Sequence, residues 1–388
     1  MNKIPRVLLL IETSSAYDRR LLLGISKYVK LHGPWIFFES PPHYYCRDHD
    51  GKIKVSSWVK NCGVNGIIVC EPWKTDEILS LGLPTITSPD RIQNLPALIT
   101  DSAATARIAA EHLLSCGFRN FAYCGFDELE WSRARGEYFA RFIAEAGFET
   151  HVYRRSKLQA QRSWDREQGF LADWLKSLTK PVGLMACNDY RGGQLTEICR
   201  IIGLDVPGDI GILGVDNDEL FCEFSDPPLS SVPLAAERAG YEAAELLDKL
   251  MAGKKKMAGQ TIVDRPGFVV ARQSTNILAI KDREIAEVVR YIRDHFNVSF
   301  SVSQVADEVA MSRRSLERRF RKALGCTVKS EINRVRVERL CSMLAETTQS
   351  VSEIAMSFGF PSVDHISRYF RRNKGMSPLT YRKRFGLK

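Results

Sequence analysis

The stretch SVSQVA at residues 301–306 returns 49 positions later as SVSEIA at residues 350–355. After the following turn the offset becomes 50, so that Phe320 matches Phe370 and one residue has been added in the second turn. Each copy predicts a short helix, a turn, and a second helix that begins at a serine suited to N-capping. The repeat therefore predicts two helix-turn-helix units near the C-terminus.

The second helix of each copy has one apolar and one charged face. Leu316 and Phe320 lie four residues apart and share the face expected to be buried. The candidate DNA-binding residues on the charged faces are Arg313, Arg314, Glu317, Arg318 and Arg321 in the first copy and Asp364, His365, Arg368 and Arg371 in the second. Such side chains reach phosphates and base edges in a major groove. One charged helix face is usually solvated surface, but its duplication favours double-stranded DNA as the partner.

These residues resemble the AraC/XylS-type DNA-binding domain over residues 282–385. The match includes SVSEIA, FGF at residues 358–360, YFRR at 369–372 and GMSPLTYR at 375–382. The resemblance implies seven helices, with residues 327–347 as a rod between the two units. It also implies that one monomer places two helices in successive major-groove segments.

The excess of positive charge lies in this module alone. Residues 281–388 hold 22 Lys and Arg against 12 Asp and Glu, whereas the first 280 residues hold 33 against 34. A polyanionic partner is thus indicated for the C-terminal module only. The chain of 388 residues is long enough for two or three domains, and its 44% hydrophobic content is ordinary for a globular protein.

The first 280 residues alternate short apolar runs with amphipathic stretches, which predicts an α/β architecture with doubly wound parallel sheets. Nine runs are expected to be strands, at residues 6–13, 35–39, 66–70, 84–86, 97–100, 120–125, 150–153, 182–187 and 210–215. Because this length is large for one sheet, we expect two lobes with a cleft between them.

Polar clusters follow several of these strands, where open α/β sheets bind their ligands. The candidate ligand-binding residues are Asp18, Arg135, Asn188, Asp189, Asp216 and Asn217. Carboxylates, amides and an arginine converging on one cleft suit a neutral polyhydroxylated ligand, with Trp131, Trp73 or Tyr17 covering an apolar ring face. The alternative is that these are ordinary loop residues and that Asp189 and Asp216 cap helices.

Residues 5–275 resemble the ligand-binding domain of LacI/GalR-type repressors and periplasmic sugar-binding proteins, most strongly in GILGVDNDE at 211–219. This resemblance implies that Asp216 and Arg135 contact sugar hydroxyls. Unlike those repressors, the chain carries its DNA module at the C-terminal end. A LacI-like sensor ahead of an AraC-type module resembles regulators of xylose operons, which implies D-xylose as the ligand, with another pentose or a hexose as the alternative.

The expected domains are a two-lobed sensor at 1–276, a linker at 277–283 and the DNA-binding domain at 284–388. We expect a transcription activator, with a repressor as the alternative. A homodimer is expected, because sensors of this type commonly dimerise, and an activator would also contact RNA polymerase. The short linker predicts mechanical coupling between sensor and DNA module.

Other classes are disfavoured by what the sequence lacks. Its ten cysteines form no C-x-x-C pair, which favours free thiols in a reducing cytoplasm over disulfides or a metal site, and no cofactor is expected. An enzyme with a DNA-targeting tail, such as a DNA-repair methyltransferase, needs an activated thiolate, and no cysteine has suitable neighbours. A transport-associated sugar-binding protein would need a signal peptide, and neither that nor a membrane span is predicted.

Overall fold

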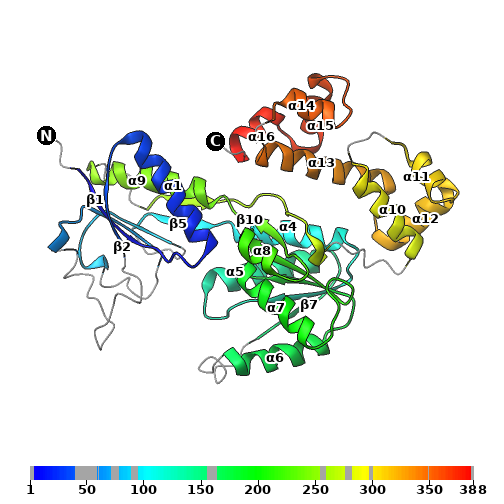
Figure 1. Cartoon of the computed structure of the whole chain (residues 1–388), viewed down its shortest axis with the longest axis horizontal. Coiled ribbons are helices and arrows are strands. Elements are labelled where there is room, and N and C mark those ends of the chain that lie inside the picture. Colours follow the sequence, from blue (N-terminus) through cyan, green and yellow to red (C-terminus); the bar gives the residue numbers. More distant parts are fainter. Residues whose placement is uncertain are drawn as a thin grey trace.

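The computed structural model describes residues 4–39, 59, 61–70, 78–88, 95–154, 164–253, 259–275, 282–296, 300–347 and 349–385. The N-terminal lobe is built on a parallel sheet with the strand order β11-β5-β4-β3-β1-β2 (Figure 1). Its strands are β1 (Arg6–Leu10), β2 (Ile36–Glu39), β3 (Gly66–Val69), β4 (Thr85–Thr87), β5 (Ala97–Thr100) and β11 (Thr261–Asp264). Strand β1 lies between β3 and the edge strand β2, and Val7 to Leu10 are all buried, as a parallel strand covered on both faces requires.

The C-terminal lobe has its own parallel sheet, in the order β10-β9-β8-β6-β7. Its strands are β6 (Asn120–Cys124), β7 (Thr150–Val152), β8 (Val182–Ala186), β9 (Ile210–Asp216) and β10 (Ser230–Pro233). Two separate sheets confirm the expected two-lobed α/β architecture. Strands β10 and β11 were not among the nine runs expected to be strands.

Helices α1 (Ala16–His32) and α9 (Ala236–Met251) pack closely on the N-terminal lobe. Their contact depends on two glycines, because a Cβ at Gly24 would lie 1.8 Å from the carbonyl oxygen of Glu237 and one at Gly240 would lie 2.0 Å from that of Leu21. The C-terminal lobe is covered by α4 (Ser102–Ser115), α5 (Glu130–Glu145), α6 (Trp164–Ser177), α7 (Asp189–Ile201) and α8 (Glu219–Phe224). The close crossing of α1 and α9 places the N-terminus of α1 at the edge of the interlobe cleft.

The chain passes between the lobes at neighbouring points. Strand β5 leads through Asp101 into α4, β10 leads into α9, and the segment after β11 returns to the C-terminal lobe. The amide of Asp101 donates to the carbonyl of Asp264 at 2.8 Å, which ties the first and third crossings together. The second and third run antiparallel, with bridges from Leu234 to Pro266 and from Ser231 to Val270. These crossings form the hinge of the sensor.

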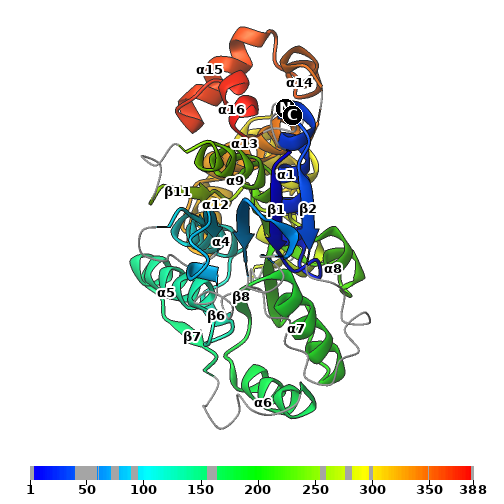
Figure 2. The same ribbon diagram turned by 90° about the vertical axis from the view of Figure 1, so that its left-hand side faces the viewer.

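The C-terminal module contains seven helices in the described residues, as the family resemblance implied, and it lies along one side of the sensor (Figures 1 and 2). They are α10 (Arg283–Asp294), α11 (Val302–Glu308), α12 (Arg313–Leu324), α13 (Val328–Glu346), α14 (Val351–Ser357), α15 (Val363–Lys374) and α16 (Pro378–Phe385). Helix α13 is the expected rod. The expected linker at 277–283 falls mostly outside the described residues, so the domain boundary stays a prediction.

Each half of the module has its own hydrophobic core. Leu316 and Phe320 are fully buried with α10 and α11, and Ile366 and Phe370 are fully buried with α14 and α16. The apolar faces predicted from the repeat are therefore the buried ones. No helix in the described part of the chain is long and apolar enough to cross a membrane.

Candidate functional sites

The end of β9 carries two residues in an unusual backbone conformation. Asp216 has a φ of 102° and Asn217 has a φ of 49°, a region that residues other than glycine rarely adopt. The Asn217 amide donates to Ser231 Oγ at 3.0 Å, and its carbonyl accepts from Arg20 Nη2 at 3.1 Å. Strained backbone of this kind persists where the surroundings hold it, often at ligand sites.

Three carboxyl groups from different parts of the chain lie at or near the end of β9. Asp18 lies on α1, Asp264 ends β11, and Asp216 ends β9, so the group spans both lobes. Burial raises the pKa of each to about 7, and the charge of Asp216 further raises those of Asp18 and Asp264. These effects on the pKa values show that the three carboxyl groups are poorly solvated and that Asp216 lies near the other two.

Arg135 supplies positive charge to this group. It is 2% exposed on α5, its Nη1 donates to the carbonyl of Cys187, and its guanidinium lies 5.1 Å from the centre of the Trp131 ring. Its charge lowers the pKa values of Asp216 and Asp264. The structure thus brings Arg135 and Asp18 close to Asp216, and their role toward a ligand stays a prediction.

Two buried polar atoms in the cleft have no hydrogen-bond partner among the described residues. They are Arg135 Nε and Asn217 Oδ1. The Tyr17 hydroxyl and the Asp264 carboxyl group are buried beside each other, and hydrogen bonds from the Ala235 backbone and from Tyr17 lower the pKa that burial raises at Asp264. Asp264 is only 1% exposed. An unpartnered buried polar group costs about 1–3 kcal/mol, so a bound molecule with hydroxyl groups would remove a real penalty here.

Asp264 is not among the candidate ligand-binding residues predicted from the sequence, and Tyr17 is predicted there only to cover an apolar ring face. Trp73, predicted for the same role, lies outside the described residues. A signal for Asp264 was present, because it follows Ile262 and Val263 just as Asp216 follows an apolar strand. Burial and the charge of Asp264 raise the pKa of Tyr17 well above its ordinary value. The hydroxyl of Tyr17 is therefore held as a neutral donor in the cleft.

Asn188 and Asp189 have internal partners. Asn188 caps α7, since its Oδ1 accepts from the Arg191 amide at 3.0 Å. Asp189 is 1% exposed, and its oxygens accept from Ser231 Oγ at 2.5 Å and from the Asp218 amide at 2.7 Å. The cap of α7 is thus Asn188 and not Asp189, which the capping alternative had named, and the contacts of Asp189 hold the loop after β9 in place.

Arginines of α1 bridge the two lobes beside the cleft. Arg19 Nη2 pairs with Asp218 Oδ2 at 2.9 Å, and Arg20 Nη2 donates to the Asn217 carbonyl. Asp218 also caps α8 through the Leu220 amide. The N-terminus of α1 is thereby tied to the loop that carries Asp216.

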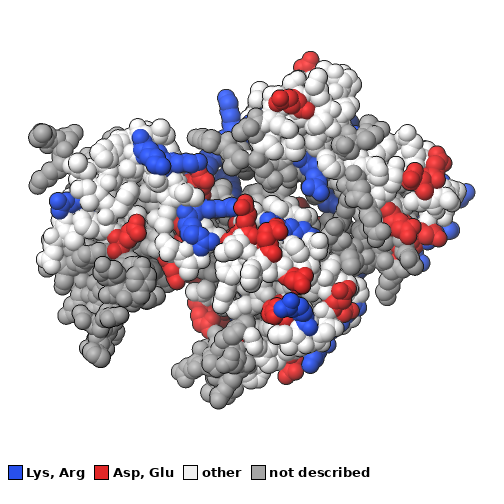
Figure 3. Space-filling model, in the orientation of Figure 1, with Lys and Arg blue, Asp and Glu red and all other residues white. Residues whose placement is uncertain are grey.

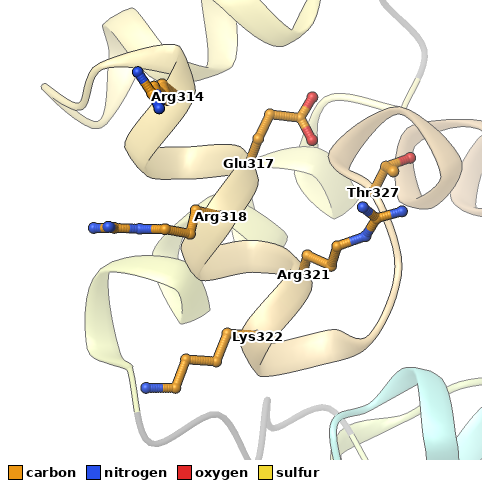
Figure 4. Close-up of a pocket in the computed structure, with 6 residues that line it drawn as sticks. All are labelled: Arg314, Glu317, Arg318, Arg321, Lys322 and Thr327. Atoms are coloured by element: carbon orange, nitrogen blue, oxygen red, sulfur yellow. The ribbon is translucent and has the colours of Figure 1, made fainter.

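Helix α12 presents the first charged face predicted from the repeat. Arg314, Arg318 and Lys322 project to one side of the helix, and Glu317 and Arg321 project toward Thr327 (Figure 4). Together they line a concavity of about 540 Å³. Arg313, Arg314, Arg318 and Arg321 are exposed and Glu317 is half-buried, so the row of guanidinium groups is available to a partner.

Helix α15 presents the second charged face. Asp364, His365, Arg368 and Arg371 are all exposed. Arg368 Nε donates to the Asp364 carbonyl at 3.4 Å, and His365 Nδ1 lies 3.0 Å from Ser362 Oγ at the start of the helix. By contrast, basic and acidic side chains are interspersed over the face of the sensor drawn in Figure 3.

The thiols of the C-terminal lobe are suited to packing. Burial raises the pKa of Cys187 to about 11 and that of Cys199 to about 12. Such thiols stay protonated, which is the reverse of the activation that thiolate chemistry needs. In the described residues no group of His, Cys, Asp and Glu could hold a metal ion.

Comparisons with known proteins agree with this division of the chain. Residues 110–275 match the model of a periplasmic binding protein-like domain, and residues 305–384 match that of a helix-turn-helix domain. A two-lobed sensor joined to two helix-turn-helix units defines a ligand-responsive, DNA-binding transcription regulator, not an enzyme.

Two curated relatives are similar over nearly the whole chain. The xylose operon regulatory protein of Escherichia coli K12 is 30% identical over 98% of this chain and 97% of its own length, and that of Haemophilus influenzae is 29% identical over 97% and 98%. This chain belongs to the family of xylose operon regulatory proteins.

Solved structures are also similar. A xylose-binding transcription activator matches with a TM-score of 0.61 and 28% identity over all of both chains. A transcriptional regulator in complex with cellobiose matches 70% of this chain and 84% of its own with a TM-score of 0.56 and 18% identity, which shows the sensor fold alone.

Proposed function

We propose that this regulator binds a neutral sugar in the interlobe cleft, with D-xylose as the first candidate, and that the bound sugar changes how the two helix-turn-helix units engage DNA. The carrying observation is the pair of buried polar atoms without partners, Arg135 Nε and Asn217 Oδ1, beside the buried carboxyl groups of Asp216 and Asp264. The similar regulators named above act on xylose operons or bind xylose, which supports D-xylose. Another pentose or a hexose is the alternative ligand.

In this proposal each side chain has a distinct role toward the sugar. Asp18, Asp216 and Asp264 accept hydrogen bonds from hydroxyl groups, and Arg135 donates to a ring or hydroxyl oxygen. The indole of Trp131, beside Arg135, covers an apolar face of the ring. Asn217 adds its free Oδ1. Asn188 and Asp189 support the loop instead of touching the ligand, because their side-chain oxygens accept hydrogen bonds within the lobe.

On the DNA side, we propose that α12 and α15 enter successive major-groove segments of one duplex. Arg313, Arg314, Glu317, Arg318 and Arg321 would contact one segment, and Asp364, His365, Arg368 and Arg371 the next. The regulator would work in the cytoplasm, where its DNA lies, as a homodimer that activates transcription by contacting RNA polymerase; action as a repressor is the alternative. The exposed arginines on both helices support this assignment.

Thermal unfolding of the full chain with a panel of free pentoses, hexoses and sugar phosphates tests the ligand. A sugar at 100 times its Kd stabilises the binding state by about 2.7 kcal/mol, which gives a measurable rise in Tm. We expect D-xylose to raise the Tm and Asp216→Asn to abolish that rise while DNA binding is retained. Asp173→Asn, at an exposed position on α6, is the matched control and should respond like the wild type.

The other outcomes are equally informative. A rise with a different neutral sugar would reassign the ligand and keep the cleft. A response confined to sugar phosphates, or an unchanged response in Asp216→Asn, would contradict the proposed site.

A further inference from the structure

The segment that follows Asp264 connects the cleft to the DNA-binding module. Residues 265–270, here called the hinge segment, run beside the β10–α9 crossing. The Gly267 amide donates to the Pro233 carbonyl at 2.7 Å, and Val270 exchanges two backbone hydrogen bonds with Ser231 at 2.8 and 3.1 Å. Ser231 also bonds Asp189 and Asn217. The hinge segment is therefore fixed at both ends to residues that shape the cleft.

Phe268 leaves the hinge segment and packs into the second helix-turn-helix unit. Its ring centre lies 5.7 Å from that of Tyr381 on α16, and Lys374 Nζ lies 4.2 Å above its ring. It joins the same apolar cluster as the fully buried Ile366 and Phe370. A side chain of the sensor thus completes the core of a DNA-binding unit.

The first unit is held by a different part of the sensor. Arg119, between α4 and β6, donates from Nη2 to the Ala323 carbonyl at 2.8 Å and from Nη1 to the Phe118 carbonyl at 2.8 Å. The Ala323 carbonyl is among the last four of α12, which lack a partner within the helix and attract positive charge. Figure 1 shows α16 over the middle of the sensor and α12 beyond the end of the C-terminal lobe.

Phe268 lies on the hinge segment, which begins at the end of β11 in the N-terminal lobe and pairs with β10, whereas Arg119 lies on the C-terminal lobe. Helix α13 joins the two units and has 19 residues, about 28 Å of rigid rod. A shift of the hinge segment relative to Arg119 would therefore either turn the whole module or break one anchor, which is how a small change at a ligand becomes a switch.

We propose that Phe268 is the positioning residue through which the state of the cleft is transmitted to the second helix-turn-helix unit. Asp264, whose buried carboxyl group lies beside Tyr17 and interacts with Asp216, is four residues before it. A ligand that binds Asp264 fixes the backbone conformation of the hinge segment. It thereby fixes the position at which α16 packs against Phe268. This inference rests on the proposed function for its sugar, but the anchor itself is independent of any ligand.

The coupling between sugar and DNA tests the transmission. The Kd for a duplex selected from a random library with the full chain is measured with and without saturating D-xylose. We expect the ratio of the two values to fall toward one in Phe268→Ala and to be retained in Phe268→Tyr, which keeps the ring. Phe224→Ala removes an aromatic ring that is 88% exposed on α8 and should leave the ratio unchanged. A wild-type ratio in Phe268→Ala overturns the proposal.

A second measurement needs neither sugar nor DNA. Hydrogen exchange of the full chain should be faster across α16 in Phe268→Ala and unchanged across α12, whereas Arg119→Ala should affect only the end of α12. Equal exchange across α16 in Phe268→Ala and the wild type overturns the proposal. If no sugar changes the DNA affinity of the wild-type chain, the proposed function is refuted. The hydrogen-exchange result would still decide whether Phe268 holds the second unit.

Discussion

The two helix-turn-helix units have nearly the same local structure and different attachments. Both begin with a capping box, in which Ser301 pairs with Gln304 and Ser350 pairs with Glu353. Both recognition helices end at a glycine in the left-handed region, with φ values of 74° and 71°. The repeated sequence therefore specifies the unit, and residues outside the repeat decide how each unit is held.

The attachments differ in chemistry. In the first unit Arg319 pairs with Asp282 through Nη2 and Nε, at 2.5 and 2.8 Å, and with Glu284 at 2.5 Å, which ties α12 to the start of α10. The matching residue of the second unit is Tyr369, whose hydroxyl lies 3.2 Å from Asn333 Oδ1 on α13. These two contacts are here called locks. The Arg319 lock is ionic and joins α12 to the start of α10, whereas the Tyr369 lock is a neutral hydrogen bond to α13.

The largest expected effect tests whether the cores are equivalent. Phe320→Ala and Phe370→Ala each empty a fully buried site and should lower the free energy of unfolding of their own unit by about 3–5 kcal/mol. Urea unfolding of the full chain measures this, with Leu379→Ala at a 61% exposed position of α16 as the control. A loss in only one of the two variants would break the equivalence.

A smaller effect concerns the DNA contacts. Arg318→Ala and Arg368→Ala should each cost about 1–3 kcal/mol and relax the preference at a single base position, because one bidentate contact with guanine is lost. The two positions should be separated by about one helical turn, near 10 base pairs. Selection of duplexes with each variant measures both. Lys322→Ala, if it contacts only phosphate, should weaken all sequences alike; relaxation at the same position in both arginine variants would contradict separate recognition helices.

The smallest expected effect separates the two locks. Arg319→Ala should lower the free energy of unfolding slightly, because an exposed ion pair contributes little, and Tyr369→Phe by less. The hydrogen bond from Arg319 lowers the pKa of Asp282, so this lock stabilises the folded chain above the ordinary carboxyl pKa and the contribution is lost as the pH falls through the lowered value. Between pH 7 and pH 3, the free energy of unfolding should therefore fall more steeply with decreasing pH in the wild type and in Tyr369→Phe than in Arg319→Ala. Parallel curves for all three would show that the locks are alike.

The sequence predicted most of the architecture because its signals are local. The repeat, the serine caps and the strand-end position of Asp216 depend on residues close together in the chain. The role of Asp189 could not be predicted in this way, since a polar residue at the start of a helix can cap that helix or contact a ligand. In the structure Asn188 is the cap, and Asp189 binds Ser231 and the Asp218 amide.

The remaining features depend on distant pairs. Asp264 meets Tyr17 only after the chain has crossed between the lobes, and Phe268 meets Tyr381 across more than a hundred residues. In the sequence, Phe268 is one aromatic residue beside a short edge strand. Nothing local marks it as a contact between domains.

The central claim is that the sensor cleft and the DNA-binding units are coupled. Its most direct test is the Kd of the full chain for a selected duplex with and without D-xylose, together with the Kd for D-xylose with and without that duplex. The account predicts that the sugar changes DNA affinity by about 5-fold or more, and that DNA changes sugar affinity by the same factor, as thermodynamic linkage requires. Binding of both molecules with neither affinity changed by the other would contradict it.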